Sequence, residues 1–206
     1  SEMCIRDRFG LKHLDALKNI ADIEGVSVMG PNRDKIAALA NERHIEHFSN
    51  SLEECISLQN VDAVILSTPT QMHANQAIKC MDAGKHVLVE IPMADTLADS
   101  NRIVDKKRET GLVCMAGHVR RFNPSHQWIN NKIKAGELKI QQMDAQTYFF
   151  RRTNTNAKGE PRSWTDHLLW HHACHTVDLF QYQTQSKVVR TFGCLLYTSP
   201  SPRDDR

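Results

Sequence analysis

Near the end of the chain, three side chains have the types and spacing needed for acid–base chemistry: His171, His175 and Asp178. On a helix, residues four and seven positions apart share one face, whereas the neighbouring His172 would point about 100° away. Histidine changes its charge near neutral pH. We therefore expect His175 to be a general base that His171 and Asp178 support.

Two other interpretations of this cluster stay open. His171 and His175 have the spacing of zinc ligands on a helix, but the glutamate usual between such histidines is missing and no third ligand is evident. They could also be hydrogen-bonded helix histidines with no catalytic role. We expect no metal site.

The elements that must position these residues alternate between strands and helices, as in a parallel sheet. The runs 62–67 and 86–90 are apolar with no polar face, which is typical of strands buried on both sides. Between them, 71–83 has apolar residues at helical spacing, and Gly84 ends this helix. The same criteria predict strands at 26–29 and 112–116, and helices at 34–43, 51–58 (with Ser51 as N-cap and Glu54 at the third position) and 96–110, which Gly111 ends.

Loops at the carboxyl ends of two of these strands are expected to line a ligand crevice. Thr68 and Pro69 follow the strand 62–67, while Glu90 and Pro92 lie at the end of the strand 86–90. In an open parallel sheet, ligands bind outside the carboxyl ends of the strands. We therefore expect a dinucleotide to lie against these four residues.

The start of the chain holds only part of a dinucleotide-binding signature. Such a fold opens with a strand and a G-x-G-x-x-G turn, which sets pyrophosphate on a helix N-terminus; here Gly10 could be the third glycine. After the strand 26–29, where an acidic residue would bind a ribose hydroxyl, the chain offers Arg33 instead. Arg33 could pair with a 2′-phosphate, so we expect NADP in preference to NAD. It could also be a solvent-exposed arginine at a helix start.

The pattern changes after residue 122. A helix is predicted to start at Asn123 and Pro124 and to end near Gly136. Over 138–150 the side chains then follow a pattern of period two, which predicts a long antiparallel strand. The predicted fold class is α/β. A Rossmann-type doubly wound parallel sheet without its first strand occupies 9–122, and a truncated α+β domain with an antiparallel sheet occupies 123–193.

The two ends of the chain resemble the translation of a DNA adapter sequence. One DNA sequence, translated on its two opposite strands, encodes both residues 1–7 and residues 194–200. We therefore expect 1–8 and 194–206 to be adapter-derived. Because the first strand and most of the second sheet would then be missing, we expect the 206-residue chain alone to be inactive.

Composition describes an ordinary globular protein. A net charge of +2, 24% charged residues and the lack of a long apolar run indicate neither nucleic-acid nor membrane binding. Four cysteines lie between the adapter segments, widely spaced and without metal-ligand spacing: Cys55, Cys80, Cys114 and Cys174. This usage suits a reducing compartment, so we expect a cytoplasmic protein.

Several strings of the chain resemble the Gfo/Idh/MocA oxidoreductases, over essentially residues 9–193. They are Thr68-Pro69 with His73, Ala83-Gly84-Lys85-His86-Val87, Glu90-x-Pro92, Gly117-His118-x-Arg120-Arg121-Phe122-Asn123-Pro124, and a His-x-x-Asp ending at Asp178. Longer strings, among them 121–126 and the block from 141 to 172, resemble a subfamily that oxidises the cyclic hemiacetal of a dicarboxylated semialdehyde to 2-pyrone-4,6-dicarboxylate with NADP or NAD. The resemblance also implies that His73 and Trp164 contact the cofactor and that the full-length protein is a homo-oligomer.

Two departures from the wider family narrow the expected chemistry. A lysine that many members have between the glutamate and the proline is Ile91 here, and the aspartate usual four residues before the histidine is His171. Both departures are shared with the subfamily, and they leave His175 as the expected base.

A substrate with two carboxylates also requires planar cations, because guanidinium groups bind carboxylates in bidentate pairs. Five arginines flank the domain junction in sequence: Arg120, Arg121, Arg151, Arg152 and Arg162. Any one of them could be a solvated surface charge, but we expect at least two to face the substrate. Three other functions stay open: a dehydrogenase of the same family acting on a sugar or dihydrodiol, a non-catalytic dinucleotide-binding regulator, and a zinc hydrolase.

Overall fold

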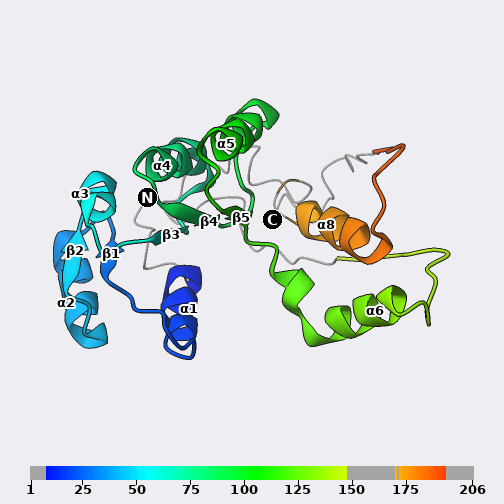
Figure 1. The fold of residues 1–206 in the computed structure, drawn as a ribbon, viewed down its shortest axis with the longest axis horizontal. Helices are drawn as coiled ribbons and strands as arrows, with labels where there is room; N and C mark the ends of the chain where they lie inside the picture. The colour runs from blue at the N-terminus through cyan, green and yellow to red at the C-terminus, as the bar shows by residue number, and fades with distance from the viewer. Residues whose placement is uncertain (1–7, 148–169, 171, 194–206) are drawn as a thin grey trace, which may run out of the picture.

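Two parallel sheets and the helices around them make up the first part of the structure, a computed structural model that describes residues 8–147, 170 and 172–193 (Figure 1). One sheet pairs β1 (Ser27–Met29) with β2 (His47–Ser49), and the other contains β3 (Ala63–Leu66), β4 (His86–Val89) and β5 (Cys114–Ala116). The helices of this part are α1 (Arg8–Leu17), α2 (Arg33–Arg43), α3 (Leu52–Ser57), α4 (Thr70–Asp82) and α5 (Leu97–Thr110). The predicted α/β class with a parallel sheet is confirmed.

All strand pairs described run parallel, and this sets where their loops emerge. Val64 lies opposite Val87, which in turn lies opposite Cys114. The chain passes from β3 to β4 through α4 and from β4 to β5 through α5, and these two helices lie beside each other on the sheet (Figure 1). Since parallel strands end at the same edge, the loops that follow β3, β4 and β5 lie together.

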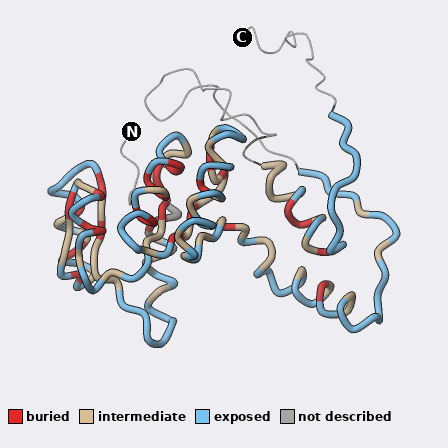
Figure 2. The backbone as a smooth tube through the Cα atoms, turned by 45° about the horizontal axis from the view of Figure 1, so that its top comes forward, coloured by how far each residue is buried: buried red, intermediate tan, exposed pale blue. Residues whose placement is uncertain are grey.

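Many buried residues belong to this sheet, α4 and α5, and buried residues are drawn red in Figure 2. Seven of them are at most 2% exposed: Leu66, Ala77, Cys80, Met81, Val87, Val89 and Ile103. Burying a large apolar side chain stabilises a fold by about 1.5–3 kcal/mol relative to leaving it in water. A smaller cluster of Val28, Ile36, Ala40 and Ile45 packs under the β1–β2 sheet.

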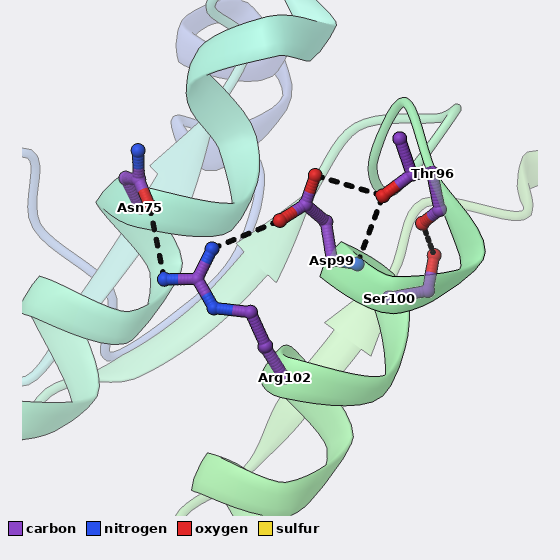
Figure 3. Close-up of polar contacts among 5 residues, drawn as sticks. All are labelled: Asn75, Thr96, Asp99, Ser100 and Arg102. Atoms are coloured by element: carbon purple, nitrogen blue, oxygen red, sulfur yellow. Dashed lines mark hydrogen bonds and ion pairs between the residues drawn. The ribbon is translucent and has the colours of Figure 1, made fainter.

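The start of α5 shows how the sequence sets a helix boundary (Figure 3). The Thr96 hydroxyl accepts a hydrogen bond from the Asp99 N–H at 3.0 Å and donates one to Asp99 Oδ2 at 2.9 Å. Arg102 donates to Asp99 at 2.9 Å and to Asn75 of α4 at 3.2 Å, so it joins the two helices. The cap satisfies an N–H that has no partner within the helix. At the other end, Gly111 closes α5 in the left-handed conformation (φ 69°), as predicted.

Helix α3 begins after Ser51, the predicted N-cap, and its first turn is tied to the preceding strand. The Ser51 hydroxyl accepts from the Glu54 N–H at 3.4 Å. The Glu54 carboxylate accepts a hydrogen bond from the Ser49 hydroxyl at the end of β2. Ser49 Oγ also accepts from the Ser51 N–H at 3.0 Å, so this buried serine connects β2 to α3.

The predicted antiparallel strand at 138–150 is wrong over its described part. Residues 138–147 form no strand and are mostly exposed, whereas 148–150 lie outside the described residues. A strand needs a neighbour that satisfies its backbone N–H and C=O groups, and no described segment pairs with 138–147. Alternation alone was not enough to form a strand here.

A pair of helices follows the second sheet. The 3₁₀ turn η1 (Val119–Phe122) leads into α6 (Pro124–Lys134), which begins and ends where the sequence predicted, and α8 (Ala173–Thr184) packs beside it (Figure 1). Buried amides hold the pair together: Asn130 Nδ2 donates to the Tyr182 carbonyl at 2.9 Å, and Gln183 Nε2 donates to the His126 carbonyl at 2.8 Å. None of the helices in the described part of the chain has the length and apolar character of a membrane span.

Candidate functional site

Three loops meet at the carboxyl edge of the β3–β4–β5 sheet. Thr68 and Pro69 follow β3, Glu90 and Pro92 follow β4, and Gly117 follows β5. Backbone hydrogen bonds keep the loops in register, since the Glu90 N–H donates to the Leu66 carbonyl at 2.9 Å and the Gly117 N–H to the Val89 carbonyl at 2.8 Å. The structure therefore brings the four loop residues predicted for cofactor binding together, and their role stays a prediction.

His73, in the first turn of α4, ties two of these loops to each other. Its ring is 2% exposed, with Nε2 2.7 Å from the Thr68 carbonyl oxygen and Nδ1 2.9 Å from the Pro92 carbonyl oxygen. Both partners are acceptors, so the ring donates to both only when both nitrogens carry a proton. These bonds give His73 a positioning role, and the cofactor contact predicted for it stays a prediction.

Glu90 connects the sheet edge to α1. Its Oε1 lies 2.6 Å from His13 Nε2, and its Oε2 accepts from the Ile91 N–H at 3.3 Å. Burial raises the pKa of Glu90, but the hydrogen bond and charge of His13 and the Ile91 N–H outweigh burial, so the pKa lies below its usual value. A Cβ at Gly117 would lie 3.3 Å from this carboxylate, so glycine allows the loop after β5 to approach it closely.

Arg121 and Asp178 form a two-pronged ion pair that joins η1 to α8. Arg121 Nε lies 2.8 Å from Oδ2, and Nη2 lies 2.5 Å from Oδ1. The hydrogen bonds to Asp178 raise the pKa of Arg121 above its ordinary value. The guanidinium also lies over the Tyr182 ring, 5.4 Å from its centroid. The sequence assigned Arg121 to the substrate and Asp178 to the base, whereas the structure pairs them with each other.

His118 lies beside this ion pair, and the sequence analysis gave it no role. Its Nδ1 is 3.6 Å from Asp178 Oδ2, beyond hydrogen-bonding range, and has no hydrogen-bond partner among the described residues. Burial and the charge of Arg121 lower the pKa of His118, and Asp178 opposes them only in part. Its position directly after Gly117, at the carboxyl end of β5, is the sequence signal that could have identified it.

His175, the candidate base, lies in the first turn of α8 with a half-buried ring. In the part of the chain that the structure describes, its buried Nδ1 has no hydrogen-bond partner. Burial lowers the pKa of His175, and the charges of Arg120, His118 and His172 lower it further, while Glu90 raises it. The neutral imidazole, which can accept a proton, is therefore favoured near neutral pH.

The remaining predicted site residues are scattered or lie outside the described residues. Gly10 is buried in the first turn of α1. Arg33 begins α2 directly after β1, and its guanidinium lies 5.7 Å from the centroid of the Phe48 ring. Five predicted site residues lie outside the described residues: Arg151, Arg152, Arg162, Trp164 and His171. Within residues 8–147, 170 and 172–193, no group of three or more His, Cys, Asp or Glu side chains could hold a metal ion.

Two protein-family models match the chain. The model described as "Oxidoreductase family, NAD-binding Rossmann fold" matches residues 7–118, and "Bacterial oxidoreductases, C-terminal" matches residues 124–197. The first match alone covers more than half of the 206 residues.

Two curated relatives show how far the similarity extends. The chain is 64% identical over 182 residues to 4-carboxy-2-hydroxymuconate-6-semialdehyde dehydrogenase of Sphingobium sp., which covers 88% of this chain and 58% of the relative. It is 33% identical over 132 residues to scyllo-inositol 2-dehydrogenase (NAD(+)) of Bacillus subtilis, which covers 64% of this chain and 39% of the relative. The chain thus spans about half the length of the curated relatives it matches.

Solved structures share the fold. A probable dehydrogenase from Thermotoga maritima superimposes with a TM-score of 0.72 at 21% identity, over 88% of this chain and 53% of that chain. The scyllo-inositol dehydrogenase from Lactobacillus casei, with bound NAD(H) and scyllo-inositol, superimposes with a TM-score of 0.60 at 20% identity, over 63% of this chain and 39% of that chain. At these identities the likeness concerns the fold alone. With the matching family model and the 64% identical relative, it is clear that the chain belongs to the Gfo/Idh/MocA family of oxidoreductases with an NAD-binding Rossmann fold.

Proposed function

We propose that the protein carrying this sequence is an NADP-dependent dehydrogenase that oxidises the cyclic hemiacetal of 4-carboxy-2-hydroxymuconate-6-semialdehyde to 2-pyrone-4,6-dicarboxylate. The observation that carries the proposal is the setting of His175, a half-buried imidazole with an unpartnered ring nitrogen in the described structure, close to the charges of Arg120 and Glu90. The 64% identical relative, whose name specifies this semialdehyde, supports the choice of substrate.

The loops at the carboxyl edge fit a nicotinamide dinucleotide. Gly10 lies in the first turn of α1, where we assign it as the third glycine of the dinucleotide turn, which packs the helix against the sheet and so positions the helix N-terminus for pyrophosphate. Glu90, held by His13, and the close approach at Gly117 shape the place where the nicotinamide would lie. When bound, the nicotinamide supplies the acceptor for a hydride.

His175 would remove the proton in this reaction. Oxidation of the hemiacetal requires that its hydroxyl lose a proton and its carbon lose a hydride, which leaves the carbonyl of the pyrone. The imidazole accepts a proton only in its neutral form, and burial together with the surrounding cations favours that form. His118, with its own lowered pKa, lies close enough to influence this proton.

Arg120 is the guanidinium that we assign to a substrate carboxylate. It has no ion pair within the described residues, and its charge lowers the pKa values of both His175 and Cys174, so it lies near the candidate base. Arg121 is engaged by Asp178, and we assign it to positioning α8 against η1. We assign the second substrate carboxylate to the remaining predicted arginines, Arg151, Arg152 and Arg162.

Arg33 supports NADP as the cofactor. It stands at the start of α2, next to the end of β1, and packs over Phe48 while staying exposed. An arginine at this place can pair with the 2′-phosphate, and no acidic residue lies between β1 and Arg33 to repel that phosphate.

We also propose a cytoplasmic homo-oligomer. The four described cysteines are all free thiols, in keeping with a reducing compartment. Large apolar side chains are exposed on the helical pair and after it, including Trp128 at 60% and Phe192 at 89%, and a subunit contact would cover them.

A substrate panel on the protein that carries this sequence tests the proposal. Reduction of NADP and of NAD would be followed with the semialdehyde, scyllo-inositol and myo-inositol, and the product would be identified by mass. We expect efficient turnover only with the semialdehyde, to the pyrone dicarboxylate, and a preference for NADP. Comparable turnover of an inositol would favour a sugar dehydrogenase, and tight NADP binding without turnover would favour a regulator.

A further inference from the structure

A cavity of about 360 Å³ lies between the end of α6 and the end of α8, and the proposed reaction does not use it. Its lining includes Lys134 from α6 and Gln181, Gln185 and Lys187 from the end of α8 and just after it. His175 is at the opposite end of α8. Gln181, the lining residue of α8 nearest to His175 in sequence, follows it by six positions, which is about 9 Å along a helix that rises 1.5 Å per residue.

The lining of this cavity is cationic. None of its eight lining residues is acidic, and three are basic: Arg121, Lys134 and Lys187. Neither lysine has an ion-pair partner in the described part of the chain. Asp178 binds Nε and Nη2 of Arg121, so Nη1 remains without an acceptor among the described residues. Like charges around one cavity repel each other, and an anion between them relieves that repulsion.

Neutral hydrogen-bonding groups complete the lining. Asn130 is 0% exposed, and its position is held by the bond from Nδ2 to the Tyr182 carbonyl. Gln185 and Ser186 add an amide and a hydroxyl at the end of α8. The Ser186 hydroxyl donates to the Thr184 carbonyl at 3.1 Å, so the Gln185 amide is the group that can orient a carboxylate once the cations have attracted it.

We propose that this cavity binds a small organic anion with two or three carboxylates, through Lys134, Lys187 and the free edge of Arg121. The three cations come from three different segments, namely α6, the residues after α8, and η1. A polycarboxylate presents its charges at separate points and can meet all three cations. Inorganic phosphate concentrates its charge at one point and cannot do so as well. The proposal does not depend on the proposed reaction.

Isothermal titration of the full 206-residue chain with citrate, without cofactor and at constant ionic strength, tests this site. We expect saturable 1:1 binding that weakens by about tenfold in Lys134→Gln and in Lys187→Gln, because each removes a charge-assisted contact. Lys139→Gln is the matched control. It removes the same charge from an exposed lysine that does not line the cavity, and citrate binding should not change.

Three results would overturn the proposal. The first is no saturable binding of citrate by the folded chain, with folding checked by circular dichroism. The second is an equal loss of affinity in Lys139→Gln, which would mean that citrate binding depends only on the net charge of the protein. The third is binding of inorganic phosphate as tight as that of citrate. In the supporting case, the side-chain amide resonances of Asn130 and Gln185 shift on saturation with citrate, and those of Asn75 on α4 do not.

Discussion

At the scale of single residues, the site depends on which charges surround His175. The ring is half-buried, and the cations near it, Arg120 above all, penalise its protonated form. Both carboxylate oxygens of Asp178 accept hydrogen bonds from Arg121, so Asp178 is not a free carboxylate partner for the base. A histidine in this setting stays neutral to lower pH than one in water, and it is therefore ready to accept a proton.

Replacing His175 should abolish most of the turnover of the complete enzyme. We expect His175→Ala to lower kcat by about 10² to 10⁴, since that is what a general base contributes, with little change in NADP affinity. His172→Ala is the control, because it removes a neighbouring imidazole at the start of α8. Wild-type turnover of His175→Ala across the pH range would eliminate this role.

Removing the charge of Arg120 should change the titration of His175 in a defined direction. The positive guanidinium lowers the pKa of His175, so Arg120→Gln should raise that pKa. The imidazole would then become protonated at higher pH, and the acid limb of the kcat profile would move to higher pH. Titration of the His175 ring resonances by NMR in both forms measures this shift. An unchanged or lower pKa in Arg120→Gln would show that the two side chains do not interact.

Arg33 should decide between the two nicotinamide cofactors. Losing a charge-assisted contact to the 2′-phosphate costs roughly 1.5–3 kcal/mol, and NAD has no such phosphate, so Arg33→Ala should weaken NADP binding much more than NAD binding. Fluorescence titration with both cofactors measures the difference. Equal effects on NADP and NAD would count against the contact.

At the scale of elements, the Arg121–Asp178 pair holds α8 against the turn that follows β5. Asp178 is 9% exposed and Arg121 is 42% exposed, so the pair is only partly screened by water. Helix α6, which follows this turn, also binds α8 through the hydrogen bonds of Asn130 and Gln183. The position of His175 relative to the sheet edge therefore depends on this ion pair.

Asp178→Asn should destabilise the protein measurably. We expect a loss of about 1–3 kcal/mol in the free energy of unfolding, because a largely buried, charge-assisted pair loses one of its charges. Asp105→Asn, which makes the same change in an exposed pair with Arg108, should cost less than about 0.5 kcal/mol. Urea unfolding of the two variants beside the unchanged chain measures both. Equal small losses would remove the structural role assigned to the Arg121–Asp178 pair.

The sequence predicted those elements whose signals are local. Helix α5 was predicted because Thr96 and Gly111 mark its two ends, and β4 because its apolar run lies between Gly84 and Pro92. The strand expected at 138–150 was not found over 138–147, because a strand depends on a pairing partner elsewhere in the chain. The short strand β2 was missed, because Phe48 is the one apolar residue in its sequence and gives no apolar run.

The candidate site could be predicted only in part for a similar reason. The loop residues Thr68 and Glu90 were found because strand ends in a parallel sheet line a crevice. The contact between His13 and Glu90 spans 77 positions in sequence, and the one between Arg121 and Asp178 spans 57. Side-chain pairing over such separations follows from tertiary packing, which no local pattern encodes.

At the scale of the whole molecule, the fold brings two unlike parts to one place. The parallel sheet supplies the loops that suit a dinucleotide, and the helical pair supplies His175 (Figure 1). His118, at the carboxyl end of β5, lies 3.6 Å from Asp178 on α8, so the two parts meet at this point. Hydride transfer and proton removal would then occur on neighbouring atoms of one substrate.

Isotope transfer is the most direct measurement of this account. The semialdehyde, labelled with deuterium at the carbon that becomes the hemiacetal centre, would be incubated with NADP and the protein that carries this sequence. The account predicts one deuterium on the reduced nicotinamide for each pyrone dicarboxylate formed, because that carbon gives up its hydrogen as a hydride while His175 takes the hydroxyl proton. Release of the deuterium into water, or formation of the pyrone without reduced nicotinamide, would contradict it.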